Sequence, residues 1–229
     1  MFATLISSMI YLMVRQFQAV EVIPAHEAIV AERQLEAQNA IGGEVAEGNI
    51  ITFGKFEQDG NLENGPEDIE WHVLKVEDGK ATLYPVYSML ACGADDIDAT
   101  IEEFASTFTD AEKSLMTSGP TLFTSDEYAS FLTDVTTDKG KCQVCDKKFL
   151  CEYTNYCKNH YHPYIDRISF SRVIAYRTKD KALFQYEQFV RDGAGSWGRD
   201  IAEVQTTSYL GNAPEGCALC PYIVIDVNK

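Results

Sequence analysis

The chain has little positive charge. Its 229 residues include 19 Lys and Arg against 35 Asp and Glu, which gives a formal net charge of -16 at pH 7. Nucleic acids and anionic lipids are bound by clustered Lys and Arg, so this composition argues against both as partners. The acid is concentrated, because fifteen Asp and Glu but two Lys lie between Glu57 and Glu112. This half therefore presents a negative face that either keeps the protein soluble or attracts a cation or basic ligand.

Long hydrophobic runs are also missing. The most apolar stretch, Met1–Val14, has fourteen residues, whereas a membrane-spanning helix needs about 20. No Lys or Arg precedes it, as a signal peptide would require. Three interpretations stay open: a signal anchor that starts upstream, a helix lying on the membrane, and a helix buried against the domain. The terminal position favours the anchor, so we expect a membrane-anchored or extracytoplasmic protein, or a cytoplasmic one if the helix is buried.

No internal repeat is visible, and composition divides the chain into three parts. Residues 1–23 form the apolar, anchor-like segment. Residues 24–43 are polar and Ala-rich, start with a proline and end in two glycines, which predicts a helical spacer. Residues 44–229 contain the remaining apolar and aromatic residues and are expected to form a single globular domain.

The globular part opens with strands. Between Ile50 and Tyr84, short runs rich in Ile, Val, Trp and Phe alternate with the turn sequences Asn64-Gly65-Pro66 and Asp78-Gly79. Two capping-box patterns, Thr100–Glu103 and Thr109–Glu112, then predict two short helices with a break near Ser106.

The second half is expected to return to strands. A short strand at 121–124 precedes a third helix at 127–132, and 134–167 has the composition of a loop. Further strands are expected at 168–176, 182–190, 203–210 and 222–227. Strands, then short helices, then strands again indicate an α+β domain with a largely antiparallel sheet and an N-terminal helix.

Several segments carry a family resemblance. They are Phe53–Gln58, Ile69–Leu74, Asp78–Ala81, Thr121–Ser125 and Pro221–Ile225. Together they resemble a family of uncharacterised bacterial domains that open with a phenylalanine-glycine strand and an isoleucine-glutamate-tryptophan strand. The resemblance implies a C-type-lectin-like fold, distantly related to formylglycine-generating enzymes, and a location outside the membrane behind a signal or anchor. It implies no established activity.

The seven cysteines carry the strongest chemical signal. Two Cys-x2-Cys pairs predict a structural zinc site made by Cys142, Cys145, Cys217 and Cys220. The alternative ligands are Cys151, Cys157, His160 and His162. This thiolate-rich loop is also typical of an iron-sulfur site, although it matches neither ferredoxin spacing. Disulfides, which an exported protein would form, and free thiols remain open alternatives.

A catalytic constellation is missing. His72, beside Trp71 on a predicted strand, is expected on the exposed face, and no histidine has a recognisable nucleophile partner. The sequence therefore favours a non-enzymatic binding or structural module with an unknown ligand or protein partner, its cysteine loop stapled by zinc. The alternative is a thiol- or metal-dependent oxidase related to formylglycine-generating enzymes, which would need two exposed cysteines of low pKa near a cleft.

Overall fold

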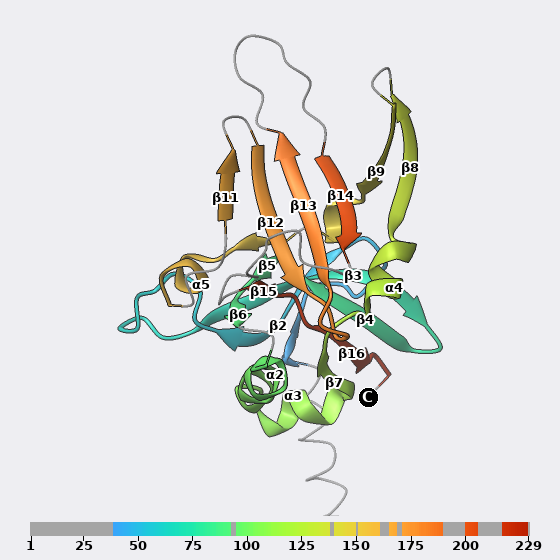
Figure 1. The fold of residues 1–229 in the computed structure, drawn as a ribbon. Helices are drawn as coiled ribbons and strands as arrows, with labels where there is room; N and C mark the ends of the chain where they lie inside the picture. Colours follow the sequence, from blue (N-terminus) through green and yellow to red (C-terminus); the bar gives the residue numbers. More distant parts are fainter. Residues whose placement is uncertain are drawn as a thin grey trace, which may run out of the picture.

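The computed structural model contains two six-stranded sheets, two two-stranded sheets and a few short helices among its described residues (Figure 1). It describes residues 39–92, 95–137, 140–149, 151–160, 165–168, 171–189, 200–205 and 217–228. The expected α+β class with a mostly antiparallel sheet is confirmed. The anchor-like segment and the spacer up to residue 38 lie outside the described residues. Within those ranges, no helix is both long and apolar enough to cross a membrane.

The first sheet contains the strand unit expected at 50–84. Its order is β1 (Ile41–Gly42), β2 (Ile50–Phe56), β3 (Glu67–Glu77), β4 (Lys80–Pro85), β16 (Tyr222–Asp226) and β7 (Met116–Thr121), all antiparallel. Asp78 and Gly79 turn β3 into β4 with positive φ angles of 51° and 71°, the conformation that Asp-Gly favours in tight hairpins. The C-terminal strand β16 lies between β4 and β7, so the chain end completes this sheet.

The second sheet stands above the first in Figure 1. Its order is β14 (Asp200–Gln205), β13 (Leu183–Phe189), β12 (Ser171–Arg177), β15 (Cys217–Leu219) and β6 (Leu90–Cys92), with β11 (Ile165–Ile168) also paired to β12. Only the pairing of β12 with β15 is parallel among the strand pairs of this sheet. Because β6 follows the β4 region and β15 directly precedes β16, the same two chain segments connect both sheets.

The expectation of a structureless loop at 134–167 is wrong. β8 (Leu132–Thr137) and β9 (Gly140–Cys145) form a hairpin, and η1 (Lys147–Phe149), β10 (Glu152–Tyr153) and α5 (Asn155–His160) follow. β10 pairs in parallel with β5 (Tyr87–Ser88). These elements are short and rich in Thr, Lys and Cys, so they lack the apolar alternation by which a half-buried strand is recognised.

The helices follow the expected pattern in part. α2 (Ile97–Ser106) and α3 (Asp110–Leu115) are separated near Ser106 as expected, and the Thr109–Glu112 capping box is present. The Thr100–Glu103 capping box is wrong, because the N-cap of α2 is Asp96, four residues earlier. There the buried Ile97 packs on the core, and the Thr100 N–H donates to the Asp96 carbonyl at 2.9 Å. α4 (Ser125–Ser130) starts with a capping box at Thr124, and the strand expected at 121–124 ends at Thr121.

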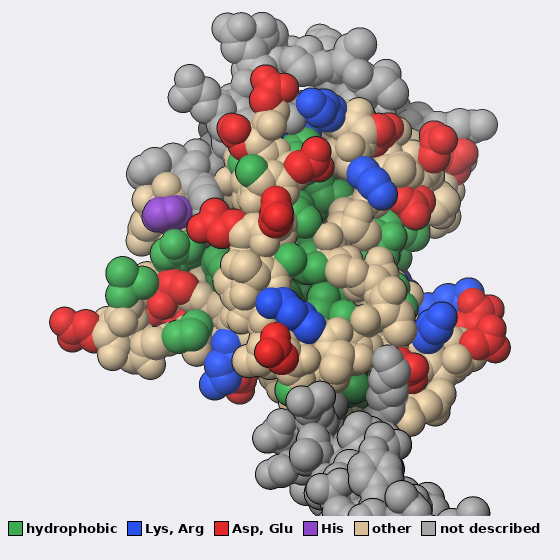
Figure 2. All heavy atoms as spheres, turned by 90° about the horizontal axis from the view of Figure 1, so that it is seen from below, with side chains coloured by type: hydrophobic (Ala, Val, Ile, Leu, Met, Phe, Trp, Pro, Cys, Tyr) green, Lys and Arg blue, Asp and Glu red, His purple; other side chains and the backbone are tan. Residues whose placement is uncertain are grey.

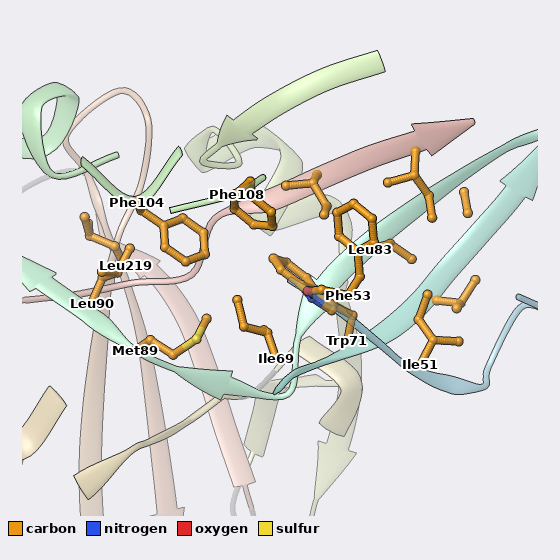
Figure 3. Close-up of a cluster of buried hydrophobic side chains, with 14 of the residues drawn as sticks. Ile51, Phe53, Ile69, Trp71, Leu83, Met89, Leu90, Phe104, Phe108 and Leu219 are labelled. Carbon is orange, nitrogen blue, oxygen red and sulfur yellow. Dashed lines mark hydrogen bonds between the residues drawn. The ribbon is translucent and has the colours of Figure 1, made fainter. Parts of the chain in front are cut away.

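Trp71 lies at the centre of the first hydrophobic core (Figure 3). Its indole N–H donates to the Phe53 carbonyl at 2.7 Å, and both side chains are closed to water. Phe104 in α2 and Phe108, which follows α2, pack on this core from the helix side, and their ring centroids are 5.3 Å apart. The helices therefore cover the face of the first sheet that β2, β3 and β4 make apolar.

Gly54 makes this packing possible. It lies at the register shift of β2, has a φ of 74°, and a Cβ there would lie 2.5 Å from Cε1 of Phe108. We expect Gly54→Ala to lower the free energy of unfolding by about 2–4 kcal/mol, because backbone strain and overpacking add. The control is Gly65→Ala, which has a φ of 76° but no described heavy atom within 4 Å. Urea unfolding curves should show a clearly smaller loss for the control, and equal losses would disprove the steric contribution.

Candidate functional site

The cysteines fall on two sides of the strand segment that contains Cys217 and Cys220. Side chains three positions apart in an extended chain point to opposite faces. Cys217 accordingly lies opposite Cys92 in the pairing of β15 with β6, whereas Cys220 packs in the second hydrophobic cluster. The C-terminal Cys-x2-Cys pair therefore does not direct both thiols to one point.

The second hydrophobic cluster buries four cysteines among tyrosine and phenylalanine rings. The cysteines are Cys145, Cys151, Cys157 and Cys220, and the tyrosines are Tyr84, Tyr128, Tyr153 and Tyr176. The Cys151 thiol donates to the Pro85 carbonyl at 3.0 Å. Burial, and then the adjacent Cys151 thiol, raise the pKa of Cys220 well above its usual value. This part of the predicted ligand set is thus built into an apolar core.

Burial raises the pKa of several thiols. It raises the pKa of both Cys145 and Cys157 to about 12. It also raises the pKa of Cys92 and Cys217, although the Arg177 guanidinium opposes the shift at both. These thiols are therefore neutral near pH 7. The low-pKa cysteine pair that an oxidase would need is not found among them.

The described side chains bring no three cysteine or histidine ligands within 4.8 Å of one another. The side chain of Cys142 and all of His162 lie outside the described part of the chain, so the zinc site stays a prediction. His160 on α5 is exposed and stacks on Tyr156 with ring centroids 4.9 Å apart. His72 is partly buried and less open than the sequence suggested, and burial lowers its pKa.

A cavity of about 490 Å³ lies between the end of β2, α2, the start of α3 and α5. The sequence did not indicate it. Its lining residues come from five separate stretches of the chain: Lys55, Phe56, Glu57, Pro66, Leu90, Thr100, Glu103, Phe104, Thr107, Thr109, Glu112 and Tyr156. The Tyr156 N–H donates to the Gln58 carbonyl at 2.9 Å, which fixes α5 beside the end of β2.

Aromatic rings form one corner of the cavity. The Phe56 ring stands nearly perpendicular to Tyr156, at 79° with centroids 5.8 Å apart, and to Phe104, at 71° and 5.4 Å. Phe104 and Leu90 are 0% and 1% exposed and close the floor. Phe56 and Tyr156 are only partly buried, so they are the rings that a ligand can reach.

Carboxylates surround this corner. Glu57 accepts a hydrogen bond from the Gly60 N–H at 2.8 Å, and Glu112 caps α3, whereas no described group bonds to the Glu103 carboxylate. The pKa of Tyr156 is raised by burial first and then by the charges of Glu103 and Glu57. The electrostatic potential in the cavity is therefore negative. Figure 2 shows Asp and Glu side chains spread around exposed apolar groups on the lower face of the molecule.

Among the described residues of the cavity wall, the one basic side chain is already engaged. Lys55 forms an ion pair with Asp68 at 3.2 Å. This described wall contains no cysteine, histidine or serine. Its chemistry is that of an apolar, aromatic and acidic binding site.

An acidic group adjoins the cavity. Carboxylate oxygens of Glu57, Asp59 and Glu67 lie within 4.8 Å of one another, close enough to hold a metal ion. Two of them already organise the loop after β2: the Asn61 N–H donates to Asp59 at 2.6 Å and the Gln58 N–H to Glu67 at 2.7 Å. The pKa of Asp59 is lowered mainly by this backbone hydrogen bond from Asn61. The turns of the loop thus account for these carboxylates except for Oε1 of Glu67, which is buried without a hydrogen-bond partner among the described residues.

Comparison with known proteins supplies no further identification. No family model, no curated protein and no solved structure matches the chain. The resemblance to the uncharacterised bacterial domains, and with it the C-type-lectin-like fold, stays a prediction. Function must therefore be inferred from the cavity itself.

Proposed function

We propose that this protein is a non-enzymatic binding module whose cavity holds a methylated or quaternary ammonium group attached to a small apolar body. The perpendicular rings of Phe56 and Tyr156 beside Glu103, in a cavity of about 490 Å³, are the observation that carries the proposal. A volume of this size is typical of small-molecule sites.

Aromatic rings and carboxylates suit such a cation for different reasons. A quaternary ammonium has no N–H to donate, so it is bound through ring faces and charge. A cation over an aromatic face within about 6 Å gains about 0.5–1 kcal/mol at an exposed site and about 2 kcal/mol when water is excluded. The unengaged carboxylate of Glu103 supplies the opposite charge, and the floor of Leu90 and Phe104 receives methyl groups.

The charges of the cavity disfavour other small ligands. An anion would meet Glu57, Glu103 and Glu112, and the one lysine is paired with Asp68. The described part of the wall contains no cysteine, histidine or serine, the side chains of the commonest nucleophile and base pairs, which supports binding rather than catalysis. A negative electrostatic potential also raises the local concentration of cations and speeds their association.

The wider proposal rests on the sequence. In this wider proposal the protein is bacterial and membrane-tethered or exported, and it has a C-type-lectin-like fold and a zinc-stapled cysteine loop. Elemental analysis of protein purified without added metal, with intact mass before and after reduction, tests the zinc. About one equivalent of zinc with no mass change supports it, whereas a gain of about two mass units per bridge on reduction replaces it with disulfides.

The ammonium proposal is tested by titrating the protein with choline and with its uncharged isostere 3,3-dimethylbutan-1-ol, followed by NMR. We expect choline to bind at least about tenfold more tightly, because the isostere keeps the methyl groups but lacks the charge. Tyr156→Ala and Glu103→Gln should each weaken choline binding by about tenfold. The matched control is Glu102→Gln, on the same helix but lining a different hollow; it should change nothing.

Two outcomes would overturn the proposal. Equal binding of choline and the alcohol would mean that charge has no part in recognition. Equal effects of Glu103→Gln and Glu102→Gln would place any attraction in the general negative charge of the surface rather than in the cavity.

A further inference from the structure

Cys92 and Cys217 face each other across two paired strands. In the antiparallel register of β6 and β15, Cys217 lies opposite Cys92, Ala218 opposite Ala91 and Leu219 opposite Leu90. Directly opposite residues project their side chains on the same face, with Cβ atoms about 4.5–5.5 Å apart. A disulfide needs a Cα separation of about 4.4–6.8 Å. The register therefore places this pair where a bridge closes with small shifts.

Access to the two thiols differs. Cys92 is partly exposed, and Cys217 is 0% exposed. The other cysteines with described side chains are all buried: Cys145, Cys151, Cys157 and Cys220. Among these six, a reagent in water therefore meets Cys92 first, and Cys217 lies behind it as a second thiol.

A buried arginine adjoins the pair. Arg177 is 4% exposed; it donates from Nη2 to the Cys217 sulfur at 3.5 Å and from Nη1 to the Lys181 carbonyl at 3.4 Å. Its Nε is buried without a partner among the described residues, and none of their carboxylates lies within 4.0 Å of the guanidinium. Buried charges are normally paired, and the Cys217 sulfur is the side-chain partner of this guanidinium among the described residues.

We propose that Cys92 and Cys217 are a redox-active dithiol that low-molecular-weight disulfides oxidise to an intramolecular disulfide. Cys92, in the small fraction that is ionised, attacks one sulfur of the disulfide, forms a mixed disulfide and releases the first small thiolate, which takes up the proton that Cys92 lost. The Cys217 sulfur, beside Arg177, then attacks the Cys92 sulfur, and the second small thiolate leaves and takes the proton of Cys217. Two protein thiols are oxidised and one small disulfide is reduced to two thiols.

A second pair of thiols in the protein serves as a comparison for Cys92 and Cys217. Cys151 and Cys220 are also neighbouring thiols, but they are 1% and 0% exposed within the tyrosine cluster. A small disulfide cannot reach them while the protein is folded. The proposal does not depend on the ammonium cavity, because no cysteine is among the described residues of its wall. It competes with the predicted zinc site for Cys217, because a sulfur in a disulfide cannot also bind zinc as a thiolate.

The test uses the full chain, reduced and then treated with oxidised glutathione, blocked with N-ethylmaleimide and digested with trypsin without reduction. Trypsin places Cys92 in peptide 81–113, Cys151 and Cys157 in 149–158, and Cys217 and Cys220 in 200–229. We expect peptides 81–113 and 200–229 to become linked, with a loss of about two mass units. Cys220→Ser and Cys151→Ser should keep this link.

Two single substitutions show which of the two cysteines reacts first with glutathione disulfide. Cys92→Ser should abolish glutathione-dependent oxidation, and Cys217→Ser should trap a glutathione adduct on peptide 81–113. A link between 149–158 and 200–229 in place of the expected one, or a link to 81–113 that survives Cys217→Ser, would overturn the proposal. If a variant fails to fold, fragmentation of the linked wild-type peptides in the mass spectrometer still distinguishes Cys217 from Cys220, because the unlinked cysteine carries N-ethylmaleimide.

Discussion

Replacing Trp71 with alanine is expected to lower the free energy of unfolding by about 3–5 kcal/mol, the usual cost of deleting a large core aromatic. The indole is 0% exposed and packs between the strands of the first sheet and the α2 region. Its removal leaves a large cavity. It also leaves the buried Phe53 carbonyl without the indole hydrogen bond that it now accepts at 2.7 Å.

Two further variants separate these contributions. Trp71→Phe keeps most of the packing but loses the donor, so we expect a smaller loss of about 1–3 kcal/mol. Leu62→Ala, at a side chain that is 76% exposed, should change stability by less than about 0.5 kcal/mol. Urea unfolding followed by circular dichroism measures all three. Equal losses for Trp71→Ala and Trp71→Phe would show that the hydrogen bond, not packing, dominates.

The β2, β3 and β4 part of the first sheet could be predicted because its strands bury one face. In β3 the residues Ile69, Trp71 and Val73 are 2%, 0% and 1% exposed, whereas Glu70 between them is exposed. This alternation has the period of a half-buried strand. The Asp-Gly turn sets its pairing with β4. Local chemistry therefore determines this part of the fold.

The strands expected at 168–176 and 182–190 correspond to the neighbouring strands β12 and β13, but the place of β6 and β15 in the second sheet depends on distant contacts. β6 has three residues and pairs with β15, which lies more than a hundred positions later in the chain. A strand of three residues has too few positions to show a period. Its place is set by the strands on either side and by hydrogen bonds such as that from the Ser88 hydroxyl to the Leu219 carbonyl at 3.1 Å.

The residues of the candidate site also depend on contacts between distant parts of the chain, which the sequence does not show. The spacing of Cys217 and Cys220 indicated a common metal, but an extended strand sends residues three apart to opposite faces, and the segment was itself next to a predicted strand. The aromatic corner had no such signal. Phe56 ends a strand, Glu103 lies on a helix and Tyr156 on another helix, so only the folded chain brings them together.

The buried tyrosines and cysteines predict a steep loss of stability in alkali. Burial, followed by the neighbouring Cys151, raises the pKa of Tyr84 and Tyr176 well above the usual 10.0, and burial also raises the pKa of Tyr128. The unfolded chain loses protons from Cys near pH 9.0 and from Tyr near pH 10.0, while the native state keeps them. The unfolded state then binds fewer protons, so stability falls as pH rises.

The pH window follows from these values. Stability is fully present below about pH 9, and the contributions of Cys145 and Cys157 are lost as pH rises from about 9 to about 12. Each buried group lowers the free energy of unfolding by at most about 1.4 kcal/mol per pH unit. With several groups acting together, we expect the protein to unfold between about pH 10 and 11.

Urea unfolding at a series of pH values, with a non-thiol reductant present, measures how the free energy of unfolding changes per pH unit. Tyr84→Phe removes one buried hydroxyl, which now lies 3.1 Å from that of Tyr128. It should reduce the slope above pH 10 by up to about 1.4 kcal/mol per pH unit, whatever its effect at neutral pH. Exposed tyrosines such as Tyr87 ionise first, and the remaining tyrosinate absorbance should rise together with the loss of circular dichroism, because the buried hydroxyls ionise only when the chain unfolds. Complete ionisation of all tyrosines before unfolding, or a slope unchanged in Tyr84→Phe, would mean that these hydroxyls reach water in the native state.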